Sequence, residues 1–252
     1  MRPLQTDLSI YRKFNFEKPP VGIKYLYHKP EGIEPLDKSL ALCEMLKEAQ
    51  QRATPFYFTK ENENCFGKSA LGMTEGGASF AESGLLGYKL EVFQEPRANA
   101  RLFRHNHSLG KGTVNYVIFS PLDKLTFEPD LLVLMTTPGQ AEIVLRAMTY
   151  STGDIYESKT SIVLSCSWLY IYPYLSGKLN YMMTGLGFGT KGRQVFPEGW
   201  LLISIPYNWI PTITQNLREM KWALPAYTGG KEKFMQYEQQ IMKELAQEAR
   251  NP

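Results

Sequence analysis

Three cysteines are the residues of this chain best suited to hold a metal or a cofactor. They are Cys43, Cys65 and Cys166. No Cys-x-x-Cys pair occurs, which excludes a zinc ribbon and the cysteine run of bacterial ferredoxins. Their odd number also argues against a disulfide scaffold. Two interpretations stay open: buried thiols that pack like small hydrophobic side chains, or thiolates that meet only after folding and share a metal or cluster.

The segment around Gly67 resembles the end of a phosphate-binding P-loop, because it reads Gly67-Lys68-Ser69. Asn62 stands where that motif requires its first glycine, and no strand ending in a magnesium-binding aspartate is evident. Nucleotide hydrolysis is therefore not expected.

A second glycine-rich segment, TGLGFGTKGR, covers residues 184–193. Its spacing is G-x-G-x-G-x-x-G, whereas a dinucleotide-binding turn has G-x-G-x-x-G and opens a helix. We expect no helix before Pro197, so the pattern favours a flexible turn between strands. The alternative is an anion pocket formed by the backbone amides together with Lys191 and Arg193.

His105 and His107 would face the same side of a strand, where two imidazoles suit a metal. The surrounding segment carries several basic residues and no acid, which is typical of a solvated face or a loop. No G-x-S-x-G motif occurs, and the three histidines yield no Ser-His-Asp set. Because no acid–base pair can be named, the sequence does not decide whether the protein is an enzyme.

An aromatic segment follows Cys166 and is typical of a protein core. Its aromatic members are Trp168, Tyr170, Tyr172 and Tyr174. The alternative is that this segment lines a pocket for a flat cofactor, with Met182 and Met183 of the next strand as a second wall.

The composition is that of a folded protein rather than a disordered one. The chain has 252 residues, of which 43% are hydrophobic and 21% are charged, enough for one large domain or two small ones. A net charge of +3 argues against binding to nucleic acid or anionic lipid. Neither a signal peptide nor a stretch of roughly 20 apolar residues is present, so we expect a cytoplasmic protein that does not enter a membrane.

Short apolar or alternating runs predict strands at 20–27, 54–59, 114–120, 130–135, 161–166, 178–184 and 200–206. Helix formers predict helices at 37–51, from Pro138 to just before Gly153, from beyond Pro206 to Met220, and at 231–249. Asp37 or Ser39 is the expected N-cap of the first helix. The connections are not regular β-α-β units, so the predicted fold class is α+β: an irregular mixed α/β fold of mixed sheets with packed helices.

The sequence divides into a mixed domain at 1–230 and a C-terminal helix at 231–252. That helix is amphipathic, with apolar residues at Phe234, Tyr237, Ile241 and Leu245. We expect it to dock on its own core, and the alternative is that it docks on a second copy of the chain as an oligomerisation element.

Several motifs together resemble one uncharacterised prokaryotic family, "domain of unknown function 169" (the ArCR group), which is frequent in anaerobes. They are PVGIKYL, LCEMLKEA, ENENCFGKSALGM, the PLDK…EPD…PGQA block and CSWLYIYPYLSGKLNYMMTGLGFGTKGR, which span roughly residues 18–220. The family name conveys no activity.

The resemblance implies a shared site, because Cys43, Cys65 and Cys166 fall on the positions where this family carries its cysteines. Three thiolates suit an iron–sulfur cluster of the 4Fe-4S type, with a non-cysteine ligand on the fourth iron. The glycine-rich loop at Gly67 would then stabilise the thiolates. A less favoured variant is zinc held by the three cysteines and His28.

The leading interpretation is thus an iron–sulfur protein for electron transfer, sensing or Lewis-acid chemistry, with Lys191 and Arg193 as further cofactor-binding residues. Its partner would be a redox protein or a small-molecule ligand. One rival is a carrier of haem or another tetrapyrrole, with a cysteine or His28 as axial ligand. Another is a metal-free assembly protein with inert thiols.

Overall fold

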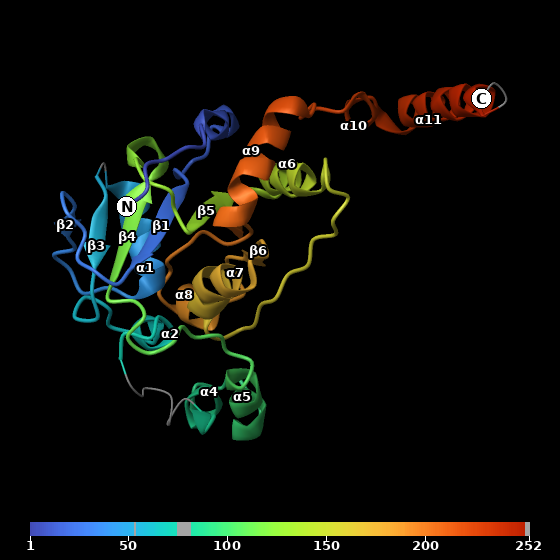
Figure 1. The fold of residues 1–252 in the computed structure, drawn as a ribbon. Helices are drawn as coiled ribbons and strands as arrows, with labels where there is room; N and C mark the ends of the chain where they lie inside the picture. The colour runs from blue at the N-terminus through green and yellow to red at the C-terminus, as the bar shows by residue number, and fades with distance from the viewer. Residues whose placement is uncertain (53, 75–81, 250–252) are drawn as a thin grey trace. The chain divides into compact units, whose positions relative to one another are not determined.

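The computed structural model describes residues 1–52, 54–74 and 82–249. Its strands are β1 (Val21–Leu26), β2 (Glu34–Pro35), β3 (Phe56–Phe58), β4 (Tyr116–Pro121), β5 (Leu131–Thr136), β6 (Asn180–Met183) and β7 (Leu201–Pro206). They form one sheet in the order β2-β3-β4-β1-β5-β7-β6 (Figure 1). Only β2 and β3 pair in parallel, and the other neighbours are antiparallel. The sheet is therefore mixed, as the sequence predicts.

The helices divide into α-helices and turns of 3-10 or π type. The α-helices are α1 (Leu42–Gln51), α2 (Gly67–Ala70), α4 (Leu85–Lys89), α5 (Pro96–Phe103), α6 (Pro138–Thr149), α7 (Tyr172–Ser176), α8 (Phe188–Gly192), α9 (Ile210–Glu219), α10 (Pro225–Thr228) and α11 (Gly230–Glu248). The others are the 3-10 turns η1 (Ser9–Phe14), η2 (Leu122–Lys124) and η4 (Tyr207–Trp209) and the π-helical turn η3 (Ser167–Ile171).

One face of the sheet shares a hydrophobic core with α1 and η3. Ile23 of β1 and Phe119 of β4 belong to the same buried cluster as Met45 of α1 and Leu169 of η3. Successive side chains of a strand point to opposite faces, so these alternate residues line one face only. This core fixes the positions of α1, which contains Cys43, and of η3, whose N-cap is Cys166.

The opposite face of the sheet is also covered. Leu132 and Ile203, whose neighbours along the strands belong to the first face, are fully buried. α6 packs against β5 and β7, and Asn216 of α9 donates to the backbone oxygen of Ala147 in α6 at 2.7 Å. Burial on both faces explains why the central strands appear in the sequence as continuous apolar runs.

Most predicted elements are confirmed, and α6 is confirmed in detail. Thr137 is its N-cap and Pro138 its first residue, and Thr137 Oγ1 accepts a hydrogen bond from the Gln140 N–H at 3.3 Å. This is the capping box that a Thr followed by Gln three residues later predicts.

Two local predictions are wrong. Residues 161–166 do not form a strand, since Leu164 has a φ of 58° and Cys166 precedes the π-helical turn η3. The first helix begins at Leu42, after the N-cap Ala41, and not at Asp37 or Ser39.

The glycine-rich segment also differs from the sequence expectation of a turn. It contains the five-residue helix α8, with Gly187 as its N-cap. Phe188 N–H donates to the Ile162 carbonyl at 2.7 Å, and Thr190 Oγ1 donates to the Gly187 carbonyl at 2.8 Å. Contacts with a distant segment therefore hold this helix despite its glycines.

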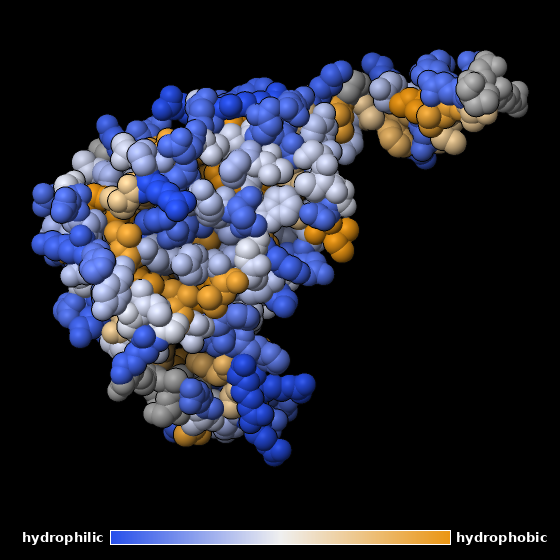
Figure 2. Space-filling view, in the orientation of Figure 1, coloured by the Kyte–Doolittle hydropathy of each residue, from blue (hydrophilic) through white to orange (hydrophobic). Residues whose placement is uncertain are grey.

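The chain divides into two compact units, Met1–Arg218 and Glu219–Pro252. The sequence-based boundary at 230 falls inside the second unit. Its helix α11 is amphipathic, with apolar atoms gathered along one side (Figure 2). The apolar residues on α11 remain exposed, at 41% for Phe234, 37% for Ile241 and 52% for Leu245. Among the described residues, no helix combines the length and apolar character needed to cross a bilayer.

Candidate cofactor site

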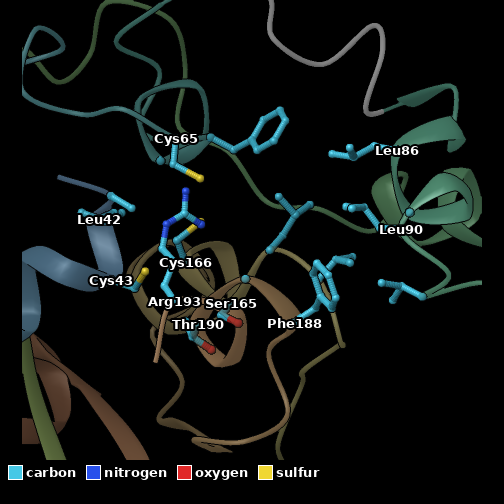
Figure 3. A pocket seen from close by; sticks show the side chains of 18 of the residues that line it. Leu42, Cys43, Cys65, Leu86, Leu90, Ser165, Cys166, Phe188, Thr190 and Arg193 are labelled. Atoms are coloured by element: carbon cyan, nitrogen blue, oxygen red, sulfur yellow. The ribbon is translucent and has the colours of Figure 1, made fainter. Parts of the chain in front are cut away.

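All three cysteines of the chain line one cavity of about 300 Å³. Cys43 is the second residue of α1, Cys65 lies in the loop before α2, and Cys166 lies at the start of η3. Figure 3 shows the three side chains on one side of the cavity, with Arg193 among them. The fold therefore brings together residues that are far apart in the sequence, and the cysteines are free thiols.

A buried carboxylate holds two of the cysteine-bearing segments. Glu63 is only 1% exposed, and it accepts hydrogen bonds from the backbone N–H groups of Leu42 at 3.0 Å, Cys65 at 2.9 Å and Lys68 at 3.1 Å. These groups lie at or near the N-termini of α1 and α2, where backbone donors lack partners within the helix. A carboxylate there also interacts favourably with the helix dipole. Glu63 thus positions Cys43 and Cys65 relative to each other.

Two glycines allow the cysteine segments to approach closely. A Cβ at Gly67 would lie 2.7 Å from Glu63 Oε1 and 2.8 Å from Leu42 Cβ. A Cβ at Gly187 would overlap Ser165 Oγ, next to Cys166. A side chain at either position would push apart the segments that carry the thiols.

The environment of the thiols favours their neutral form. Burial raises the pKa of Cys43 to about 12, with a further contribution from Cys65 and an opposing one from the Arg193 cation. Burial also raises the pKa of Cys166, to which Cys43 and Cys65 add. The mutual influence of the thiols follows from their shared place at one cavity. A bound cation or cluster would replace the thiol protons.

The two basic residues of the glycine-rich segment have different surroundings. Arg193 lines the cavity, and its guanidinium makes no ion pair within the described residues. Lys191 is not among the lining residues and pairs with Glu198 at 3.0 Å. The structure therefore brings Arg193 to the cysteines but not Lys191.

Tyr170 is a buried donor without an acceptor beside this site. Its hydroxyl has no hydrogen-bond partner among the described residues, and the residue is 1% exposed. Burial raises the pKa of Tyr170 well above its ordinary value, and Cys43 and Cys166 raise it further. An iron–sulfur cluster takes thiolate ligands, and three thiols line the cavity, so the residue types present fit such a cluster.

The histidines lie outside the cysteine cavity. His107 packs against the rings of Trp168 and Tyr172, with centroids at 5.3 and 5.2 Å, and burial lowers the pKa of its imidazole, with Lys159 as the next cause. His105 and His107 line a different surface cavity. His28 is exposed and is not among the residues that line the cysteine cavity.

No set of three His, Cys, Asp or Glu side chains in the described ranges is arranged to hold a single metal ion. A cubane iron–sulfur cluster does not require its ligands to meet at a single metal ion, because each of its irons takes a separate thiolate.

The residues predicted as alternative walls for a flat cofactor do not line the cysteine cavity. Tyr170 and Met182 belong to the hydrophobic core, whereas Met183 is 60% exposed. Neither methionine lines the cysteine cavity, whose aromatic residues are Phe66, Phe103 and Phe188.

Sequence reasoning missed Glu63 and Asn99, which both line the cavity. Glu63 precedes Cys65 by two residues inside the ENENCFGKS motif, so an acid beside a candidate ligand was the one available signal. Asn99 lies on α5, in a segment whose many basic residues indicated a solvated surface. Nothing in its local sequence signals burial.

Comparison with known proteins identifies the family. Uncharacterized protein MJ0308 of Methanocaldococcus jannaschii is 25% identical over 186 residues, which cover 72% of this chain and 79% of that protein. No solved structure matches the chain. A family model described as "Uncharacterised ArCR" matches residues 9–216. The chain therefore belongs to the ArCR family, domain of unknown function 169.

Proposed function

We propose that this protein binds an iron–sulfur cluster of the 4Fe-4S type through Cys43, Cys65 and Cys166. The observation that carries the proposal is that all three cysteines, from a helix, a loop and the start of a π-helical turn, line one cavity. Random core filling would not be expected to gather every thiol of the chain at one point.

Three neighbouring groups support this ligand set. Arg193 supplies a positive charge near Cys43, which offsets the negative charge of several thiolates. Glu63 fixes the backbone at Leu42 and Cys65. The Tyr170 hydroxyl is a donor with no acceptor in the described part of the chain, and hydrogen bonds to sulfur are a common means of tuning such clusters.

A bound cluster would supply one-electron transfer or, at an iron without a thiolate, Lewis-acid chemistry on a small molecule. The role of this chain's own residues would be to bind and shield it. The apolar wall of the cavity, which includes Leu86 and Phe188, would limit the access of water to the thiolates. The partner would be a redox protein or a small-molecule ligand.

The test is purification without oxygen, followed by iron and acid-labile sulfide analysis and an ultraviolet–visible spectrum. We expect about four irons and four sulfides per chain and a broad band that bleaches on reduction. Substitution of Cys43, Cys65 or Cys166 by Ser, one at a time, should remove most of the iron. Ser165→Ala is the matched control, because Ser165 lines the same cavity without a sulfur.

Two outcomes would overturn the proposal. One is wild-type protein that was never exposed to air and contains no iron after chemical reconstitution. The other is an unchanged iron content in Cys65→Ser. A Soret band in place of the broad band would instead identify a tetrapyrrole.

A further inference from the structure

A second cavity lies at the segment that carries His105 and His107. It has a volume of about 630 Å³ and is lined by residues at the end of α5, by residues 158–161 and by Trp168. None of the residues that line it also lines the cysteine cavity. A ligand here would therefore not compete with a cluster for space or for Arg193.

Basic groups gather in this cavity without an acid. They are Arg104, His105, His107 and Lys159, and no acid is among the described residues that line it. Arg104 and Lys159 are exposed and make no ion pair within the described ranges. Glu157, the acid nearest to Lys159 in sequence, has its Oε2 atom 3.9 Å from Lys178 Nζ instead. Like charges held together repel one another, so an anion between them is stabilised.

Hydrogen bonds hold the backbone of both basic segments. Asn180 Oδ1 accepts the Lys159 N–H at 2.9 Å, and Asn180 Nδ2 donates to the Lys159 carbonyl at 2.8 Å. Ser167 Oγ accepts the His107 N–H at 2.9 Å and donates to the His107 carbonyl at 2.7 Å. Lys159 Nζ also lies 5.3 Å from the ring centre of Tyr172, which packs against His107. The segments are thus ordered without a ligand, which lowers the entropy cost of binding one.

His107 senses the positive charge of its surroundings. Burial is the main cause of the lowered pKa of its imidazole, and the charges of Lys159 and His105 lower it further. A metal ion at the two imidazoles, which the sequence left as an alternative, would be repelled by Lys159. An anion would be attracted and would raise the pKa of His107.

The charge and size of the cavity indicate the kind of anion. A phosphate monoester carries a charge of about −1.5 to −2 at pH 7, so it matches two cations better than a carboxylate does. A volume of about 630 Å³ lies within the range of small-molecule sites and leaves room for an organic group beside the phosphate. Trp168, the aromatic residue of the lining, is only 6% exposed. It offers no open ring for the base stacking that single-stranded nucleic acids use.

We propose that this second cavity binds a small phosphate monoester, whose phosphate group pairs with Arg104 and Lys159 beside the imidazoles of His105 and His107. The organic group of the ester occupies the rest of the cavity. The proposal does not depend on the cluster, because the two cavities share no lining residue.

Isothermal titration calorimetry of the full-length protein with three probes tests the ligand class. Phenyl phosphate has the phosphate and an organic group, inorganic phosphate lacks the organic group, and benzoate carries a single charge. We expect phenyl phosphate to bind most tightly and benzoate at least about tenfold more weakly. Equal affinity for inorganic and phenyl phosphate would overturn the assignment to an ester. Equal affinity for benzoate and phenyl phosphate would overturn the assignment to phosphate.

Variants of the two cations test the place of binding. Arg104→Ala and Lys159→Ala should each weaken phenyl phosphate at least about tenfold, since each removes charge-assisted hydrogen bonds. Arg101→Ala is the matched control, because Arg101 is exposed on α5 and does not line the cavity. An equal loss of affinity in Arg101→Ala would show that the phosphate is held by the general positive charge of the surface and not by this cavity.

The three histidines of the chain supply a second readout by nuclear magnetic resonance. Sulfate serves as the probe, since its charge does not change while histidine titrates. We expect sulfate to raise the pKa of His107 by about 0.5–1 unit over sodium chloride of equal ionic strength. His28, which is exposed and outside this cavity, should keep its pKa. Equal shifts at His28 and His107, or none at His107, would overturn the proposal. Neither measurement needs iron, so a failure of the cluster proposal would be seen separately.

Discussion

Glu63 Oε1 accepts a hydrogen bond of 3.0 Å from the backbone N–H of Leu42, the first residue of the helix that carries Cys43. The same carboxylate bonds to the N–H groups of Cys65 and Lys68 through Oε2. One buried side chain therefore joins two of the three thiol-bearing segments. A residue outside the predicted ligand set thus connects the helix of Cys43 to the loop of Cys65.

Glu63→Gln tests this connection. The amide keeps the shape but replaces charge-assisted hydrogen bonds by neutral ones and turns one acceptor into a donor. We expect the free energy of unfolding to fall by about 2–3 kcal/mol, measured by urea denaturation. Glu61→Gln, at a residue two positions earlier that is exposed, should change it by less than about 0.5 kcal/mol. Equal effects at the two positions would contradict the role assigned to Glu63.

The raised pKa of Cys43 predicts slow alkylation of the cofactor-free protein. Its pKa of about 12 lies above the ordinary value, so at pH 8 the folded protein holds less thiolate than the unfolded chain. Reaction of Cys43 with iodoacetamide should be at least about tenfold slower in the folded protein than in denaturant. The rate should rise steadily between pH 8 and pH 10, as followed by mass spectrometry of the Cys43 peptide. A plateau near pH 7 would show that the thiolate is stabilised instead.

Gly187→Ala should disturb the Cys166 segment. The new methyl group would overlap Ser165 Oγ, and strain of this kind costs about 1–3 kcal/mol. We expect a lower melting temperature and reduced iron after anaerobic purification. Gly192→Ala is the matched control in the same helix, because no heavy atom outside that helix's backbone and the adjacent residues lies within 4 Å of its Cβ position. If both variants behaved like the wild type, the close approach at Gly187 would not matter.

The acid of the EPD motif has a structural role that predicts a stability loss. Asp130 Oδ1 lies 2.6 Å from Lys24 Nζ, and its Oδ2 accepts the Tyr25 N–H at 2.8 Å. Both side chains of the pair are largely buried. Asp130→Asn should lower the free energy of unfolding by about 2 kcal/mol, and Asp123→Asn, in an exposed pair with Arg12, by at most about 1 kcal/mol. Denaturant titration measures the free energy of unfolding of both variants. Equal losses at Asp130 and Asp123 would show that the buried pair contributes no more than the exposed one.

Tyr170→Phe removes the orphaned hydroxyl near Cys43 and Cys166. If it donates to cluster sulfur, its loss lowers the reduction potential by an amount on the order of 40 mV, equivalent to about 1 kcal/mol for one electron. Protein-film voltammetry measures this shift at constant iron content. Tyr11→Phe is the control, since Tyr11 is equally buried and burial, rather than the cysteines, raises its pKa. Identical reduction potentials in the wild type and in Tyr170→Phe would show that the hydroxyl makes no hydrogen bond to the cluster.

The central sheet could be predicted because its strands are locally consistent. β4 and β5 are buried on both faces, and their continuous apolar runs match that burial. α6 has its cap, its proline and its apolar stripe in one short segment. Each of these signals is local, so tertiary contacts only reinforce it.

The errors occurred where a distant residue decides the local structure. The first helix starts at Leu42 because Glu63, beyond β3, accepts its N–H. Residues 161–166 have strand-forming side chains, yet the neighbouring Lys159 is held against β6 by both amide atoms of Asn180, and Leu164 turns the chain into η3. Neither partner can be identified from the segment itself.

For the site, the family resemblance predicted that Cys43, Cys65 and Cys166 share one place. The fold explains how they come to line one cavity. Spacing alone left them as unrelated thiols. Asn99 could not be found, because its burial depends on the packing of α4 against α5 rather than on its own sequence neighbours.

The wide separation of Cys43 and Cys166 along the chain has a consequence during synthesis. A ribosome releases the segment with Cys43 and Cys65 about a hundred residues before the one with Cys166, and Arg193 emerges later still. Domains fold as their sequence becomes complete, so the nascent chain carries two unshielded thiols for much of its translation. The complete cavity therefore exists only after Arg193, the last of its lining residues, has emerged.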